Sequence, residues 1–238
     1  MSKWLKGGAF AAGLVLILFY VQYQFVITDS GTVWSLPLSG KIIIVDAGHG
    51  GIDGGASSKE GLLEKDVSLE ISLILRDYLQ EAGALVIMSR IEDTDLADPS
   101  TKGVRKRKVE DLKRRVQLVN ESGGDLFISL HLNAIPSPRW SGAQTFYNRA
   151  IDENEKVAKF IQEELIINLE NTNRLAKPIS NVYLLKHAQI PGALVEVGFL
   201  SNPEEALRLD EKNYQQKVAA SIYQGIMRYY TTEPVPSS

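Results

Sequence analysis

Short apolar runs alternate with longer amphipathic segments along most of the chain. Short segments of four or five mostly apolar residues predict buried strands at 42–45, 84–88, 126–130, 143–147, 182–185 and 193–197. Apolar residues three or four positions apart predict helices near 67–78, 109–119, 153–169 and 218–229. Strands that alternate with helices in this way predict a single α/β domain around a mainly parallel sheet.

The N-terminus carries a different pattern. Lys3 and Lys6 precede residues 7–27, which contain no charged side chain and just reach the length of about 20 apolar residues that a membrane-spanning helix needs. The preceding positive charges predict that the rest of the chain lies outside the cytoplasmic membrane. We therefore interpret residues 1–27 as an uncleaved signal-anchor. The alternative is a cleaved secretory signal, although no pair of small residues follows the apolar centre at a cleavage distance.

The remaining organisation follows from composition. Residues 28–40 contain Pro37 and little periodicity and predict a linker, residues 41–230 the folded domain, and residues 231–238 a tail. The formal net charge of -3 gives no basis for nucleic-acid binding, and the absence of cysteine excludes disulfides, thiolate metal sites and cysteine nucleophiles. The basic stretch 102–115 predicts a solvated helix face. Its alternative is contact with anionic wall polymer, anionic lipid or an accessory protein.

Four residues carry the candidate chemistry. His49 and His131 each lie just beyond the carboxyl end of a predicted buried strand, where open α/β sheets gather their sites. Glu64 lies at the start of the first long helix, and Glu196 lies inside an otherwise apolar strand, where an unpaired carboxylate is costly. Taken singly, each has a structural alternative: His49 as a turn residue, Glu64 as a helix-start acid, His131 as a core histidine and Glu196 as an ion-pair partner.

Two other interpretations of the glycine-rich segment 48–56 fail in detail. A phosphate-binding loop would continue with a lysine, but Ala56 and Ser57 follow Gly55. A dinucleotide fingerprint would have its third glycine where Asp53 stands. The segment therefore keeps a metal-ligand interpretation for its histidine.

Together, the four residues match a catalytic metal site. Two histidines and one carboxylate with an open fourth position form the His₂Glu pattern of catalytic zinc, which acidifies a bound water to a pKa of about 7. A second carboxylate must then transfer the proton of the water to the leaving amine, and Glu196 is the candidate. The pattern HExxH is absent, which excludes the zincin peptidases.

The segments GHGG-x-D-x-GA, L-x-EKD, S-x-H-x-NA and VE-x-GFLSN-x-EE occur in this order between residues 41 and 230. With them the chain resembles the zinc-dependent N-acetylmuramoyl-L-alanine amidases of the type 3 family. The resemblance implies His49, Glu64 and His131 as ligands of Zn²⁺, Glu196 as the catalytic glutamate, and a mixed six-stranded sheet flanked by helices. The chain departs from the pattern at Ala47, where many members have proline, and at Leu132, where many have alanine.

The resemblance also implies a substrate and a place of action. The substrate is the amide bond between N-acetylmuramic acid and L-alanine in peptidoglycan. An anchored single-domain member looks most like the sporulation amidases. These enzymes remove peptide stems from the peptidoglycan of the spore cortex, which allows formation of the muramic δ-lactam needed for germination. The implied partners are peptidoglycan, the cytoplasmic or forespore membrane through the N-terminal helix, and an accessory protein.

Two other functions stay open at this point. A different zinc peptidase or deacetylase of the wall is one, although carboxypeptidase-type sites carry a His-x-x-Glu pair and position 52 here is Ile. A non-catalytic anchored wall-binding module is the other, and it would be expected to lack a ligand or the proton-transfer glutamate.

Overall fold

The computed structural model describes residues 7, 12–20, 22–23 and 36–231. The chain divides into two units, Met1–Leu36 and Pro37–Ser238. In the first unit, residues 7, 12–20 and 22–23 are helical. The predicted anchor at 7–27 and the predicted tail lie partly outside the described residues. Within the described part of the chain, no helix has both the length and the hydropathy that crossing a membrane requires.

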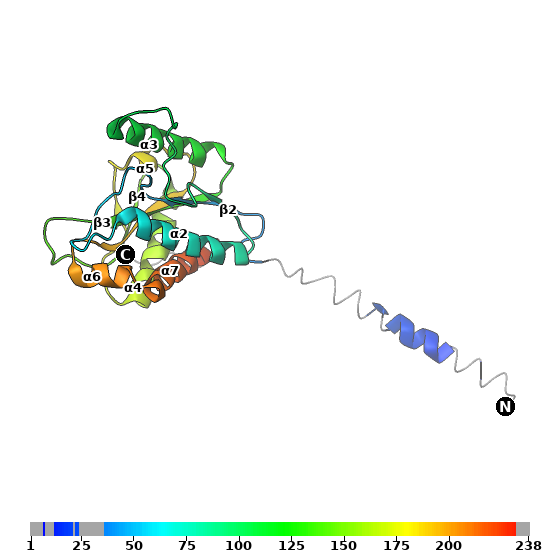
Figure 1. Ribbon diagram of the computed structural model, residues 1–238. Helices are drawn as coiled ribbons and strands as arrows, with labels where there is room; N and C mark the ends of the chain where they lie inside the picture. The colour runs from blue at the N-terminus through cyan, green and yellow to red at the C-terminus, as the bar shows by residue number, and fades with distance from the viewer. Residues whose placement is uncertain (1–6, 8–11, 21, 24–35, 232–238) are drawn as a thin grey trace. The chain divides into compact units, whose positions relative to one another are not determined.

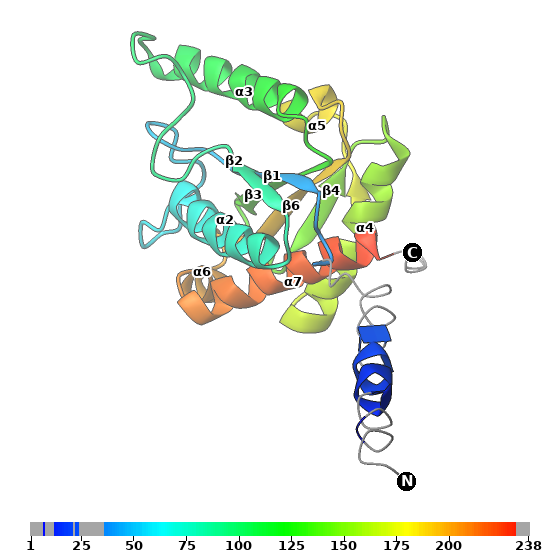
Figure 2. The same ribbon diagram turned by 90° about the vertical axis from the view of Figure 1, so that its right-hand side faces the viewer.

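The second unit is built on a six-stranded sheet with helices on both faces (Figure 1). Its strands are β1 (Ile42–Ala47), β2 (Leu85–Met88), β3 (Leu126–Asn133), β4 (Gln144–Tyr147), β5 (Lys177–Pro178) and β6 (Gly192–Phe199). Its helices are α2 (Glu64–Glu81), α3 (Val104–Glu121), α4 (Asp152–Leu169), α5 (Tyr183–His187), α6 (Pro203–Leu209) and α7 (Lys212–Tyr230). Helices α2, α4 and α7 cover one face of the sheet, and α3 and α5 lie on the other (Figure 2).

The strands follow the order β2-β1-β3-β6-β4-β5. The first four run parallel, whereas β4 runs antiparallel to β6 and pairs in parallel with β5. The prediction of a mixed, mainly parallel sheet of about six strands flanked by helices is therefore confirmed. Because β1, β3 and β6 are parallel neighbours, their carboxyl ends meet at one edge of the sheet, which is where such folds place their sites.

One predicted strand is wrong. Residues 182–185 belong mainly to the short helix α5, whose Leu184 and Leu185 are buried against the α3 face of the sheet. A run of four apolar residues is compatible with either state, since its periodicity is too short to separate them. The pattern also missed β5 and α6. The latter begins at an asparagine cap, where the Asn202 side chain accepts the N–H of Glu205, and continues with Pro203 at its first position.

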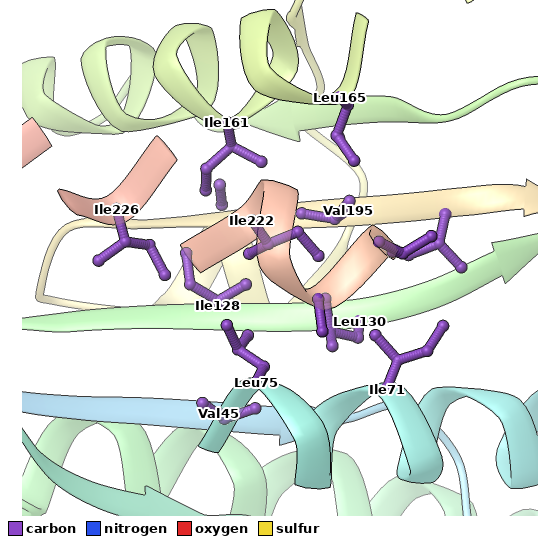
Figure 3. Close-up of a cluster of buried hydrophobic side chains, with 14 of the residues drawn as sticks. Val45, Ile71, Leu75, Ile128, Leu130, Ile161, Leu165, Val195, Ile222 and Ile226 are labelled. Carbon is purple, nitrogen blue, oxygen red and sulfur yellow. The ribbon is translucent and has the colours of Figure 1, made fainter. Parts of the chain in front are cut away.

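The larger hydrophobic core lies between the sheet and α2, α4 and α7. Figure 3 shows Ile71 and Leu75 of α2 and Ile222 of α7 beside Ile128 and Leu130 of β3, all fully buried. Each such side chain stabilises the fold by about 1.5–3 kcal/mol relative to its exposed state. The core therefore fixes β3, and with it the position of the residues at the carboxyl end of this strand.

The core extends into the segment that the sequence assigns to the linker. Leu38 is fully buried, and its N–H donates to the carbonyl of Ala82 at 2.9 Å. Residues 28–35 of the predicted linker lie outside the described part of the chain.

Candidate metal and catalytic site

The loop after β1 holds His49 in an unusual conformation. The φ of His49 is +61°, in the left-handed region that side chains other than glycine adopt only at a cost of about 1–3 kcal/mol. Two buried guanidinium groups hold the backbone here. Arg115 donates to the carbonyls of Ala47 (2.7 Å) and His49 (2.5 Å), and Arg90 donates to those of Ala47 (3.0 Å) and Gly48 (2.9 Å). Hydrogen bonds from the two guanidinium groups therefore stabilise a loop conformation that His49 would otherwise disfavour.

A buried ion pair with Asp46 holds the guanidinium of Arg115 in contact with this loop. One nitrogen of Arg115 lies 2.5 Å from Oδ1 of Asp46, and the Ser129 hydroxyl donates to Oδ2 at 2.6 Å. Burial alone would raise the pKa of Asp46, but the charge of Arg115 and the hydrogen bond from Ser129 lower it to about 2. Asp46 is therefore ionised at neutral pH, although it is almost completely buried.

Glu64, the first residue of α2, joins the two predicted histidine ligands. Its Oε2 lies 3.2 Å from Nε2 of His49, and its Oε1 lies 2.9 Å from Nδ1 of His131. The backbone N–H groups of Ala56 (2.8 Å) and Leu132 (3.0 Å) donate to the same two oxygens. Burial opposes ionisation of Glu64, but its polar contacts with the imidazoles of His131 and His49 hold its pKa well below the usual range.

The three residues fit a single ion. One ligand atom from each of His49, Glu64 and His131 lies within 4.8 Å of the others, and two imidazoles with one carboxylate are the donor set of catalytic zinc. The cradle around them is closely packed. A Cβ added at Gly48 would lie 2.5 Å from the His131 ring, and one added at Gly55 would lie 2.5 Å from Oε2 of Glu64. The structure thus brings the three predicted ligand residues together, while their role as ligands stays a prediction.

Glu196 lies on β6 beside this cluster. It pairs in register with His131 of β3, and residues opposite each other on neighbouring strands share a face of the sheet. Its Oε2 is buried and has no hydrogen-bond partner among the described residues. Burial raises the pKa of Glu196 to about 7, with Glu64 acting in the same direction and His131 and His49 opposing it. An acid of this pKa beside a ligand cluster suits proton transfer near neutral pH, a role that also stays a prediction.

The sequence did not assign a role to several residues that support the site. Asp53 accepts a hydrogen bond from His49, and Lys108 of α3 pairs with the same carboxylate. Arg115 was assigned to the basic stretch but is only 2% exposed. The expected solvated helix face is therefore correct for only part of that stretch. The role of Asp53 could have been suspected from the sequence, because Asp53 follows His49 by four residues in the glycine-rich motif.

The fold and the cluster together define a class of protein. Two histidines and a carboxylate lie at the carboxyl edge of an α/β sheet, beside a second carboxylate with one oxygen that has no hydrogen-bond partner among the described residues. Such an arrangement is that of a metal-dependent hydrolase.

Comparison with known proteins narrows this class. The chain belongs to the Amidase_3 family, described as N-acetylmuramoyl-L-alanine amidase, whose pattern matches residues 43–228. It is 59% identical over 236 residues to the germination-specific N-acetylmuramoyl-L-alanine amidase of Bacillus subtilis, covering 99% of both chains. The family resemblance and the enzyme class inferred from the sequence motifs are thereby confirmed.

Solved structures agree with this assignment. The CwlD amidase of Clostridioides difficile, solved in complex with the GerS lipoprotein, superposes with a TM-score of 0.79 at 42% identity, covering 82% of this chain and 100% of that one. The catalytic domain of CwlV, an amidase from Bacillus (Paenibacillus) polymyxa, gives 0.70 at 27% identity, with 81% and 99% coverage.

Proposed function

We propose that this amidase hydrolyses the bond between N-acetylmuramic acid and L-alanine in peptidoglycan with a zinc ion held by His49, Glu64 and His131. The observation that carries the proposal is the position of Glu64, whose two carboxylate oxygens each face one histidine. When bound, zinc polarises the scissile carbonyl and acidifies a water molecule.

The protein's own residues supply the remaining chemistry. Glu196 accepts a proton from the attacking water and donates a proton to the amine of the departing L-alanine. The unpartnered Oε2 of Glu196 supports this role, because no other group competes for the proton there. The backbone N–H groups of Ala56 and Leu132 donate to the two oxygens of Glu64 and fix their orientation, as a ligand requires.

The proposal extends to the place and time of action. We infer an anchor at residues 1–27, a linker at 28–40, a catalytic domain at 41–230 that acts outside the cytoplasmic or forespore membrane, and a tail at 231–238. The 59% identity to the germination-specific amidase of B. subtilis supports a role in maturation of the spore cortex. The GerS complex of the C. difficile relative supports an accessory protein for this chain as well.

The bond specificity is tested by digesting purified peptidoglycan with the full-length protein in mild detergent, with and without added zinc. Mass spectrometry is expected to find stems that begin with free L-alanine and glycan whose lactyl groups carry no peptide. Stems cut at an internal bond, or deacetylated sugars, would instead support a different zinc hydrolase of the wall.

The two glutamates are separated by matched substitutions. Glu196→Gln should retain zinc and lose at least about 100-fold in rate, the lower end of general acid–base catalysis. Glu64→Gln should instead lose zinc affinity, with activity partly restored by excess metal. Near-normal turnover of a zinc-loaded Glu196→Gln enzyme would remove Glu196 from the mechanism.

Retention of the anchor is tested by fractionation. The full-length chain is expected to stay with membranes after carbonate extraction. A shorter soluble form with a new N-terminus near residue 30 would show that residues 7–27 belong to a cleaved signal.

A further inference from the structure

The side chain of Asp53 connects His49 to helix α3. Oδ2 of Asp53 lies 2.9 Å from Nδ1 of His49 and 2.9 Å from Nζ of Lys108. Its other oxygen, Oδ1, accepts the N–H of Gly55 at 3.3 Å. Both oxygens of this carboxylate are therefore oriented by donors.

This contact determines which nitrogen of the imidazole is free. A neutral imidazole carries one proton, and an ionised carboxylate only accepts hydrogen bonds, so Asp53 favours the proton on Nδ1 of His49. The lone pair then lies on Nε2, the atom that faces Glu64 at 3.2 Å. A metal ligand needs this lone pair, and carboxylates behind ligand histidines commonly orient them.

We propose that Asp53 is the positioning residue that sets the tautomer and orientation of His49, and that Lys108 holds Asp53 in place. This inference rests on the proposed metal site. Lys108 of α3 would then affect metal affinity through Asp53, although Lys108 itself contacts none of the proposed ligands. Lys108 is 47% exposed, so its contribution is smaller than that of Asp53.

The proposal is tested by zinc affinity, measured by competition with a chromophoric chelator on the full-length protein. Asp53→Asn and Asp53→Ala should bind zinc about 10–100-fold more weakly, the usual cost of removing such a partner. Lys108→Met should weaken binding by a few-fold. Lys159→Met removes the lysine of an ion pair with Glu155 on α4 and serves as the matched control, with no change expected.

A second measurement separates positioning from a general structural effect. Long-range ¹H–¹⁵N spectra of the metal-free protein report which nitrogen of His49 is protonated, and Asp53→Asn should move the proton from Nδ1 towards Nε2. Zinc affinity within two-fold of wild type and an unchanged tautomer in Asp53→Asn would overturn the proposal. Unchanged zinc binding in His49→Ala would instead contradict the metal site on which it rests.

A separate observation concerns the outer face of α3. The basic side chains of residues 102–115 divide into two sets. One set forms ion pairs with acidic groups and comprises Arg107, Lys108, Arg114 and Arg115. The other set is exposed, makes no side-chain hydrogen bond or ion pair to the described residues, and comprises Lys102, Arg105, Lys106 and Lys113.

Three members of the unpaired set line a hollow of about 590 Å³ on the surface, together with Thr101, Val109 and Glu110. Val109 is 48% exposed, and the carboxylate of Glu110 is already paired with Arg114 and Thr101. Positive side chains without local partners around an exposed apolar residue are suited to an extended anionic ligand. The stem peptides of peptidoglycan carry free carboxylates and are the anionic part of the proposed substrate.

From this charge complementarity we infer that the outer face of α3 binds anionic stem peptides away from the bond that is cut. It deepens the proposed function, because the polymer would contact the enzyme at two places. Such an attraction between exposed charges falls with ionic strength, since salt screens it within about 10 Å at 0.1 M.

The test is sedimentation of the full-length protein with insoluble peptidoglycan sacculi at rising salt. Replacing Lys102, Arg105, Lys106 and Lys113 by glutamine should weaken binding at least five-fold at low salt and flatten its salt dependence, with zinc affinity unchanged. The matched control replaces four other exposed lysines, Lys59, Lys186, Lys212 and Lys217. Equal losses in both variants, or a loss of binding to anionic lipid vesicles but not to sacculi, would overturn the inference. Binding does not require cleavage, so it is measured independently of the proposed activity.

Discussion

The buried pair of Arg115 and Asp46 offers a direct test of how the site is supported. Replacing Arg115 by Met keeps much of the side-chain volume but removes the positive charge. Asp46, which is 2% exposed, then keeps its negative charge without the guanidinium that lies 2.5 Å away. The carbonyl of His49 loses its donor, that of Ala47 loses one of two, and the buried carboxylate of Asp111 loses the guanidinium 2.8 Å away.

The magnitude follows from the burial of both groups. Removing one partner of a buried ion pair costs about 3–5 kcal/mol, because the remaining charge stays desolvated. Whole domains are stable by only about 5–15 kcal/mol, and each kcal/mol shifts the Tm of a domain of this size by about 2–4 °C. We therefore expect Arg115→Met to lower the Tm by about 6–20 °C. Arg76→Met, which breaks an exposed pair with Asp77, should cost at most about 1 kcal/mol.

Thermal and urea unfolding of the metal-free protein measure the effect, and a second substitution tests its cause. Adding Asp46→Asn to Arg115→Met removes the unpaired charge of Asp46 and keeps an acceptor for Ser129, while Asp111, the other buried partner of Arg115, keeps its charge. The double variant should therefore be more stable than Arg115→Met alone but less stable than wild type. Acidification should also reduce the stability difference between Arg115→Met and wild type. Without Arg115, burial raises the pKa of Asp46, so lowering the pH protonates Asp46 and removes the cost of its buried charge. A Tm of Arg115→Met within 2 °C of wild type would refute the reasoning. A double variant no more stable than Arg115→Met would show that the buried charge of Asp46 is not the cause.

Three further predictions follow from single contacts. Gly48→Ala places a Cβ 2.5 Å from the His131 ring, so it should weaken zinc binding in a chelator competition assay, with less than about 2 kcal/mol of destabilisation by urea unfolding. Gly225→Ala on α7 places a Cβ 2.5 Å from the backbone of Ile161 on α4, so urea unfolding should show a loss of about 1–3 kcal/mol, with zinc affinity unchanged. In the wild type, folding lowers the pKa of Asp46 from 3.8 to about 2, which contributes about 2 kcal/mol to the free energy of unfolding above pH 4. This contribution is lost as the pH falls through 2, and urea unfolding at a series of acidic pH values measures the loss.

The sequence predicted the elements that carry the candidate site well, for a physical reason. His49 and His131 follow apolar runs long enough to be buried strands, and parallel strands that end together bring such residues to one edge. Glu196 stood out because a carboxylate inside an apolar strand needs a compensating role. These inferences needed only burial and strand direction, which hydrophobic patterning encodes.

The pattern did not encode contacts between side chains far apart in the sequence. Arg115 and Asp46 lie on different elements, and a basic residue within a basic stretch gives no sign that it is buried. The function of Asp53 depends on the left-handed turn at His49, which a motif does not specify. The helix α5 was missed because its buried face depends on packing against α3, a tertiary effect that overrides a four-residue pattern.

The costly features of this structure gather at the carboxyl edge of the sheet. His49 adopts a left-handed conformation, Asp46 is a buried charge, and Glu196 has a buried oxygen without a partner. The conformation of His49 and the unpartnered oxygen of Glu196 lower stability, whereas the charge of Asp46 is tolerated because Arg115 pairs with it. A hydrophobic core on the α2, α4 and α7 face offsets the cost. Because the strain lies in the loop and strands that bring His49, His131 and Glu196 together, it is better explained by the chemistry of the site than by the needs of the fold.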